Sequence, residues 1–115
     1  MKMGELDLTP DQKRRLIALL QRYLPDTEVW AYGSRVKGSA RPWSDLDLVV
    51  FATPRQHAAV SALREALEES DLPFRVDLFL WDEIPEAFRE EIRRRHIVLQ
   101  QKRTIQDDSD KMTGS

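Results

Sequence analysis

The sequence predicts one α/β domain, a small three-stranded mixed sheet flanked by about four helices. Apolar runs of strand length alternate with segments of helical periodicity, which favours a layered α/β fold. The chain has 115 residues and 41% hydrophobic content, enough for the core of a single domain. Only about a dozen residues separate the first two apolar runs, which is short for a crossover helix, so we expect that pair to be antiparallel.

The first two helices are expected to begin at the same four-residue pattern. Thr9–Gln12 reads Thr-Pro-Asp-Gln and Thr53–Gln56 reads Thr-Pro-Arg-Gln. Each offers a threonine cap, a proline at the first helical position and a glutamine three residues after the cap. Apolar residues then recur at helical spacing. We predict that the first helix ends at Pro25 and the second near Ser70.

Three segments have the composition of strands. Val29–Tyr32 is short, β-branched and aromatic. Leu46–Phe51 is almost continuously apolar, which is typical of a central strand covered on both faces. Arg75–Leu80 is the third strand. A final helix should follow it, with Asp82 as the cap and Ile84, Phe88 and Ile92 on one face.

Five ring-bearing residues need an interpretation. Trp30 and Trp81 lie near strand ends and are interpreted as packing residues, whereas Trp43 could face a nucleotide from the loop before Ser44. His57 and His96 fall in the predicted helices without the spacing of a metal-ligand pair, so we interpret both as structural.

Composition excludes several classes of protein. There is no cysteine, so neither disulfides nor thiolate metal sites are available. No apolar run approaches the roughly 20 residues that span a bilayer, and there is no signal-peptide core. We therefore expect a cytoplasmic protein without a membrane partner. A net charge of −2 argues against stable nucleic-acid binding. The folded domain should span residues 1–105, and the polar tail 106–115 should be disordered.

Acidic residues stand in two of the predicted strands. Asp45 and Asp47 enter the central strand two residues apart and therefore project to one face. Asp77 is a lone acid in the third strand. Carboxylates are costly in such positions unless a cation neutralises them. If the two strands are neighbours, the three carboxylates can form a two-metal Mg²⁺ site for phosphoryl or nucleotidyl transfer.

The loop before these acids suits a phosphate. Gly33 at the end of a strand lets the backbone approach an anion closely, and Ser34 can add a hydroxyl donor. Arg35, Lys37 and Arg41 make the loop basic, as triphosphate binding requires.

Residues 32–48, YGSRVKGSARPWSDLDL, resemble the G-S-x(10)-D-x-D signature of the DNA polymerase β-like nucleotidyltransferase superfamily. The resemblance extends over roughly residues 10–100. The short length is similar to the minimal nucleotidyltransferase branch, which is paired in operons with HEPN-domain proteins. The resemblance implies a mixed sheet flanked by helices, Mg²⁺, and ATP as the donor.

The resemblance also implies roles for individual residues. Asp45 and Asp47 would bind the metals, and Asp77 would be the base or a metal ligand for the acceptor hydroxyl. Gly33 and Ser34 would hold the nucleotide phosphates, with Ser44 as a weaker candidate. Arg35 of the basic loop is a further candidate nucleotide contact.

Three functions remain open at this point. The first is an enzyme that moves AMP from ATP to a hydroxyl, a tyrosine or serine of a HEPN-type toxin, and acts as the antitoxin. The second is an antitoxin that neutralises its partner by binding alone, with an idle nucleotide site. The third is a nucleotidyltransferase for a small molecule such as an aminoglycoside, which a chain without an added acceptor domain supports least.

Overall fold

A computed structural model of the chain describes residues 6–38 and 44–102. Its strands are β1 (Val29–Tyr32), β2 (Leu46–Val50), β3 (Val76–Leu80) and β4 (Ile97–Gln100). Its α-helices are α1 (Pro10–Tyr23), α2 (Ser34–Lys37), α3 (His57–Glu68) and α4 (Glu86–Arg94). Two short 3₁₀ helices are η1 (Pro54–Gln56) and η2 (Trp81–Glu83).

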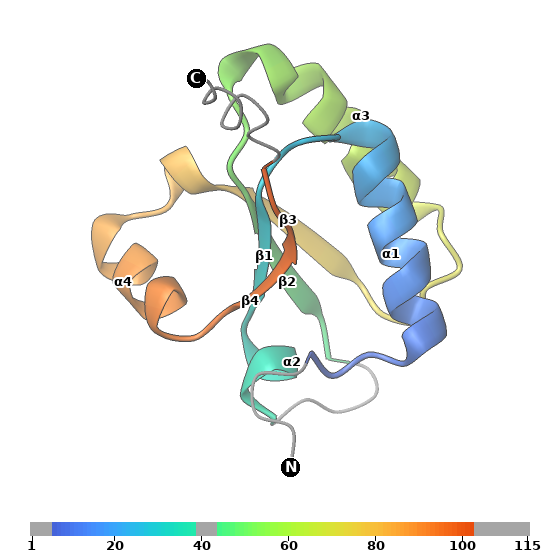
Figure 1. Cartoon of the computed structure of the whole chain (residues 1–115), viewed down its shortest axis with the longest axis horizontal. Helices are drawn as coiled ribbons and strands as arrows, with labels where there is room; N and C mark the ends of the chain where they lie inside the picture. Colours follow the sequence, from blue (N-terminus) through green and yellow to red (C-terminus); the bar gives the residue numbers. More distant parts are fainter. Residues whose placement is uncertain (1–5, 39–43, 103–115) are drawn as a thin grey trace, which may run out of the picture.

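The sheet has four strands in the order β3-β2-β1-β4. β2 is parallel to β3, and β1 is antiparallel to both β2 and β4. The predicted mixed sheet and the antiparallel first pair are confirmed. The predicted number of strands is wrong, because β4 pairs with the edge of β1 that would otherwise be free. Figure 1 shows α1 and α3 on one face of the sheet and α4 on the other, so β2 is covered on both faces as expected.

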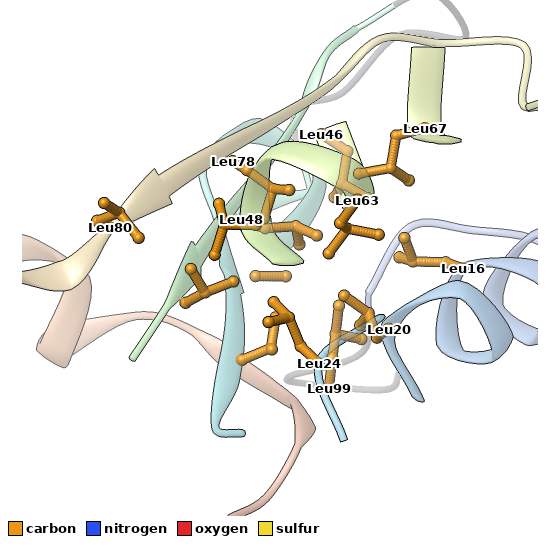
Figure 2. Packing of buried hydrophobic residues seen from close by; sticks show 14 residues of the cluster. Leu16, Leu20, Leu24, Leu46, Leu48, Leu63, Leu67, Leu78, Leu80 and Leu99 are labelled. Carbon is orange, nitrogen blue, oxygen red and sulfur yellow. The ribbon is translucent and has the colours of Figure 1, made fainter. Parts of the chain in front are cut away.

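Leucines dominate the larger core, which lies between the sheet and helices α1 and α3 (Figure 2). Leu46 and Leu48 of β2 are fully buried in it, together with Leu16 of α1 and Leu63 of α3. Because successive side chains of a strand face opposite sides, this burial directs Asp47 to the face that α4 covers. The core therefore fixes the direction in which the predicted site faces.

Aromatic rings fill the smaller core under α4. Trp30 stacks on His96 with ring centroids 3.8 Å apart, and its other neighbours are Phe51 at 4.7 Å and Trp81 at 5.7 Å. Ile92 of α4 is buried against the same group. The interpretation of Trp30 and Trp81 as packing residues is confirmed.

The two predicted helix starts are confirmed as capping boxes. In the first, the N–H of Gln12 donates to Thr9 Oγ1 at 3.1 Å, and the N–H of Thr9 donates to Gln12 Oε1 at 3.0 Å. In the second, the N–H of Thr53 donates to Gln56 Oε1 at 2.8 Å, although the first turn is the 3₁₀ helix η1. Both helices end within two residues of the predicted ends.

The last predicted helix begins later than expected. Asp82 lies in η2 and caps nothing, since Pro85 is the N-cap residue of α4. Proline fixes the backbone there, and α4 starts at the next residue. Phe88 and Ile92 lie one turn apart on α4 and line the same cavity, although Phe88 is 46% exposed; Ile84 precedes the helix. His96 follows α4 and precedes β4; its Nδ1 lies 2.9 Å from the carbonyl oxygen of Ile92, which supports a structural role outside a helix.

Some predictions fall outside the described residues. These are the basic loop residue Arg41, the proposed nucleotide contact Trp43 and the tail 106–115. His57 begins α3 and is exposed. Among the helices of residues 6–38 and 44–102, none combines the length and the apolar character needed to cross a membrane.

Candidate active site

Asp47 and Asp77 lie side by side on neighbouring parallel strands. The register pairs Asp47 of β2 with Asp77 of β3, and the antiparallel register pairs Asp47 with Tyr32 of β1. Paired residues of adjacent strands point to the same face. The two acid-bearing strands are therefore neighbours, as the predicted carboxylate site requires.

Gly33 packs directly on the Asp47 carboxylate. Its φ of +91° and ψ of −158° belong to a backbone region that is essentially restricted to glycine. A Cβ atom at this position would lie 2.7 Å from Oδ2 of Asp47, which is closer than such atoms approach in proteins. The position requires glycine both for its backbone angles and for the space that the carboxylate occupies.

The surroundings of Asp47 raise the affinity of its carboxylate for protons. Burial, then Asp77 and then Asp45 raise the pKa of Asp47 to about 6. Burial also raises the pKa of the Tyr32 hydroxyl well above its ordinary value, with Asp47 and Asp77 adding to the effect. Both shifts come first from burial and then from neighbouring carboxylates, and a bound metal ion would stabilise the ionised form of Asp47.

The donor set suits Mg²⁺, although the side chains do not converge on one point. Carboxylate oxygens are the ligands that Mg²⁺ prefers. Asp77 Oδ1 accepts a hydrogen bond from Arg75 Nε at 2.9 Å, and Asp45 is exposed. Within the two described segments, no group of three or more His, Cys, Asp and Glu side chains is arranged to hold a metal ion. Arg75 therefore competes with a metal ion for Oδ1 of Asp77, whereas the ion pair between these two described side chains does not involve Oδ2.

The predicted phosphate loop contains one helical turn. Gly33 is the N-cap of α2, Ser34 is its first residue, and Gly38 ends it by donating its N–H to the carbonyl oxygen of Ser34. Gly33 and Ser34 therefore stand at the end of β1, next to the Asp47 carboxylate. The structure brings Gly33, and with it the start of α2, against Asp47.

Arg35 uses its guanidinium group inside the fold. The side chain is only 5% exposed; Nε donates to the carbonyl oxygen of Ser44 at 3.0 Å and Nη1 to that of Asp7 at 2.8 Å. Its Cζ also lies 4.2 Å from the centre of the Phe74 ring. These contacts tie the N-terminal segment and the start of β2 to α2. Arg35 could bind a nucleotide only if some of them broke, so its predicted role stays a prediction.

A cavity of about 170 Å³ adjoins Gly33 and Asp47. Its lining also includes side chains that the sequence reasoning did not select: Tyr32, Phe88, Glu91, Ile92 and Arg95. Four of these five come from the α4 region, because α4 covers the same face of the sheet as the acids. Tyr32 directly precedes Gly33, so its position beside the motif was a usable signal. No comparable signal separated Arg95 from the other arginines of its segment.

A second, larger cavity of about 440 Å³ lies along β3 and α3. Arg75, Asp77 and Phe79 are part of its lining. Asp77 therefore borders this cavity while its strand neighbour Asp47 borders the smaller one. A ligand can therefore reach Asp47 and Asp77 from two different cavities.

A comparison with protein families shows which family the chain belongs to. A family model described as the nucleotidyltransferase domain matches residues 13–107. The chain belongs to this family. A curated relative, the "Probable protein adenylyltransferase MntA" of Haemophilus influenzae, is 46% identical to this nucleotidyltransferase domain over 100 residues, which cover 86% of the chain and 88% of the relative. The family predicted from the motif is confirmed.

Solved structures share the fold of this nucleotidyltransferase domain. One is a crystal structure of a toxin–antitoxin with AMP-PNP, in which the matched chain is 26% identical, with a TM-score of 0.64 over 84% of this chain and 77% of that one. Another holds a tri-AMPylated HEPN toxin of Shewanella oneidensis in complex with an MNT antitoxin. At 20% identity and a TM-score of 0.53, over 88% of this chain and 77% of that one, it supports the fold alone.

Proposed function

We propose that this chain is a Mg²⁺-dependent nucleotidyltransferase that transfers AMP from ATP to a hydroxyl group of a HEPN-type toxin and thereby acts as its antitoxin. The observation that carries the proposal is the pairing of Asp47 with Asp77 beside Gly33. Support for the donor and the partner comes from the relative named as an adenylyltransferase and from the toxin–antitoxin structure with AMP-PNP.

The reaction is a displacement at the α-phosphorus of ATP. The acceptor oxygen forms a bond to this phosphorus, the bond to the bridging oxygen of the β-phosphate breaks, and pyrophosphate leaves. Asp77 would accept the hydroxyl proton, because it borders the larger cavity, through which an acceptor can approach. Gly33 and Ser34 would hold the phosphates of the donor on the opposite side of the carboxylates.

Asp45 and Asp47 would hold Mg²⁺, and Asp77, whose Oδ1 pairs with Arg75, could complete the set. The bound metal would neutralise the triphosphate and lower the pKa of the acceptor hydroxyl. Ser44 remains a proposed nucleotide contact of lower rank. Arg35 is less suited to that role, because its buried guanidinium group donates to the carbonyl oxygens of Ser44 and Asp7 within the fold.

Labelled ATP, Mg²⁺ and the HEPN-type protein encoded beside this chain provide the test. We expect label on the partner, and we expect Asp45→Asn with Asp47→Asn to abolish it while the double variant still folds. A paired substitution outside the site, Asp11→Asn with Asp82→Asn, serves as the control and should label normally. Absence of labelling by the wild-type chain under every metal condition would refute the enzymatic proposal.

Neutralisation by binding alone is the second candidate. It is favoured by the ion pair of Asp77 with Arg75 and by the absence of a converged metal-ligand group among the residues described. The double variant Asp45→Asn with Asp47→Asn separates the two proposals in cells. If it still protects against the toxin, binding is sufficient; if it forms the complex but fails to protect, catalysis is required.

A further inference from the structure

The arginines at the end of α4 differ in what their guanidinium groups contact. Arg93 Nη1 pairs with Glu90 at 2.8 Å and with Glu86 at 3.2 Å, and Arg94 Nη1 pairs with Glu91 at 3.2 Å. Arg95 makes no side-chain hydrogen bond or ion pair within the part of the chain that the structure describes. Among residues 93–95, Arg95 is therefore the arginine whose guanidinium group has no partner in the described part of the chain.

Arg95 is also placed differently from its neighbours. It lines the cavity of about 170 Å³ that Gly33 and Asp47 share, whereas Arg93 and Arg94 do not. Tyr32 and Gly33 at the end of β1, where the proposed phosphate loop begins, line the same cavity. Arg95 thus borders the same cavity as Gly33, the first residue of the proposed phosphate loop.

Several contacts fix the backbone that carries this arginine. The N–H of Arg95 donates to the carbonyl oxygens of Glu91 at 3.3 Å and Ile92 at 3.2 Å, which ends α4. The next residue, His96, stacks on Trp30 at 3.8 Å. A long side chain anchored at its base in this way can reach a ligand while its attachment point stays in place.

We propose that Arg95 binds the β- and γ-phosphates of the donor nucleotide and is the cation that the sequence pattern assigned to Arg35. This inference rests on the proposed nucleotidyltransferase function. Arg95 has the chemistry for the role, because its planar guanidinium group can bind two phosphate oxygens at once. Arg35 is buried and holds two carbonyl oxygens instead.

The charge distribution explains why a cation is needed on this wall. Asp45, Asp47 and Asp77 would repel a triphosphate wherever a metal ion does not intervene. Glu91 adds a further carboxylate to the cavity lining, but Arg94 pairs with it. A phosphate oxygen that points away from the metal ligands would meet Arg95.

Calorimetric titration with Mg²⁺ and AMP-PNP, and separately with AMP, tests the inference on the full chain. Loss of charge-assisted hydrogen bonds predicts that Arg95→Gln weakens AMP-PNP binding about 10- to 100-fold. AMP lacks the outer phosphates, so its affinity should not change. Arg95→Lys keeps the positive charge but loses the planar guanidinium group, so its affinity for AMP-PNP should lie between those of the wild type and Arg95→Gln.

Arg93→Gln is the matched control, because it removes a charge from the same helix end but its partners Glu86 and Glu90 do not line the cavity. It should bind AMP-PNP like the wild type. Wild-type affinity in Arg95→Gln would overturn the inference and leave the proposed function intact. An equal loss of affinity for AMP and AMP-PNP in Arg95→Gln would also overturn it. A wild-type chain that fails to bind AMP-PNP would overturn both proposals.

Discussion

Gly33 and Asp47 fit each other in a way that leaves no space for a side chain between them. A Cβ atom on Gly33 would lie 2.7 Å from the carboxylate oxygen Oδ2 of Asp47. Gly33 directly follows β1, and Asp47 lies in β2. The antiparallel pairing of Tyr32 with Asp47 therefore holds Gly33 next to the aspartate. The G-S and D-x-D halves of the motif therefore meet in one place, and the phosphate loop and the proposed metal ligands depend on each other.

Gly33→Ala should damage both stability and activity. Alanine is strained at a φ of +91° and a ψ of −158°, which we expect to lower the unfolding free energy by about 1–3 kcal/mol. The added methyl group would also displace the Asp47 carboxylate, and misplacement of a catalytic group by about 1 Å can cost about 100-fold in rate. Urea denaturation and AMP transfer to the partner measure the two effects.

Gly38→Ala controls for the backbone strain. Gly38 has a φ of +83°, but a Cβ there meets nothing within 4 Å. It should lose about 1 kcal/mol of stability, as expected for a left-handed alanine, and keep its activity. Equal activity losses in the two variants would contradict the link between Gly33 and Asp47.

In the metal-free protein, ionisation of Asp47 should lower the free energy of unfolding as the pH rises. Its pKa is raised to about 6 in the folded chain, so the folded state holds the proton more tightly than the unfolded state. The resulting stabilisation is complete below the unfolded pKa of about 3.9 and is lost as the pH rises through 6. Asp47→Asn should be more stable than wild type at pH 8 by about 1 kcal/mol, a figure reduced for partial solvent screening.

Thermal unfolding between pH 4 and pH 8 in the presence of a chelator provides the measurement. Asp82→Asn, which alters an acid outside this cluster, should keep the wild-type pH profile. Added Mg²⁺ should stabilise the wild type at pH 8 more than Asp47→Asn, because the metal binds the ionised carboxylate. If Asp47→Asn has the same pH profile of stability as the wild type, Asp47 does not carry the effect.

Arg35→Gln separates a structural role from nucleotide binding. The substitution leaves the carbonyl oxygens of Asp7 and Ser44 without their buried donor, so we expect stability to fall by about 2–3 kcal/mol. The exposed residue Arg55 offers the matched control, since Arg55→Gln should change stability by less than about 0.5 kcal/mol. AMP-PNP binding by the folded fraction should be unchanged. Weaker binding with unchanged stability would return Arg35 to the nucleotide site.

The sequence was most informative where local chemistry decides the structure. The helix starts at Thr9 and Thr53 were predictable because a capping box involves only residues three apart. The carboxylates of Asp47 and Asp77 were recognisable because charges in apolar strands are costly. Their proximity depended on whether the two strands are neighbours, which the sequence left open and the parallel pairing of β2 with β3 shows.

Features that depend on distant packing were not predictable in the same way. β4 is four residues long and follows a run of arginines, so no turn signal or long apolar run marks it as a separate strand. It forms because the edge of β1 accepts it. Arg35 and Arg95 look alike in the sequence, and only the fold shows that one is buried and the other lines the cavity.

Arg75→Ala tests whether an ion pair holds Asp77 away from the metal. Arg75 Nε lies 2.9 Å from Asp77 Oδ1, and the two side chains are 75% and 25% exposed. An ion pair this exposed contributes at most about 1 kcal/mol, so stability should change little. Removal of the competing cation should lower the Mg²⁺ concentration needed for half-maximal AMP transfer, while Arg64→Ala, which alters the same cavity without touching Asp77, should not. An unchanged or higher Mg²⁺ requirement in Arg75→Ala would mean that Asp77 acts from its present position, as a base rather than as a metal ligand.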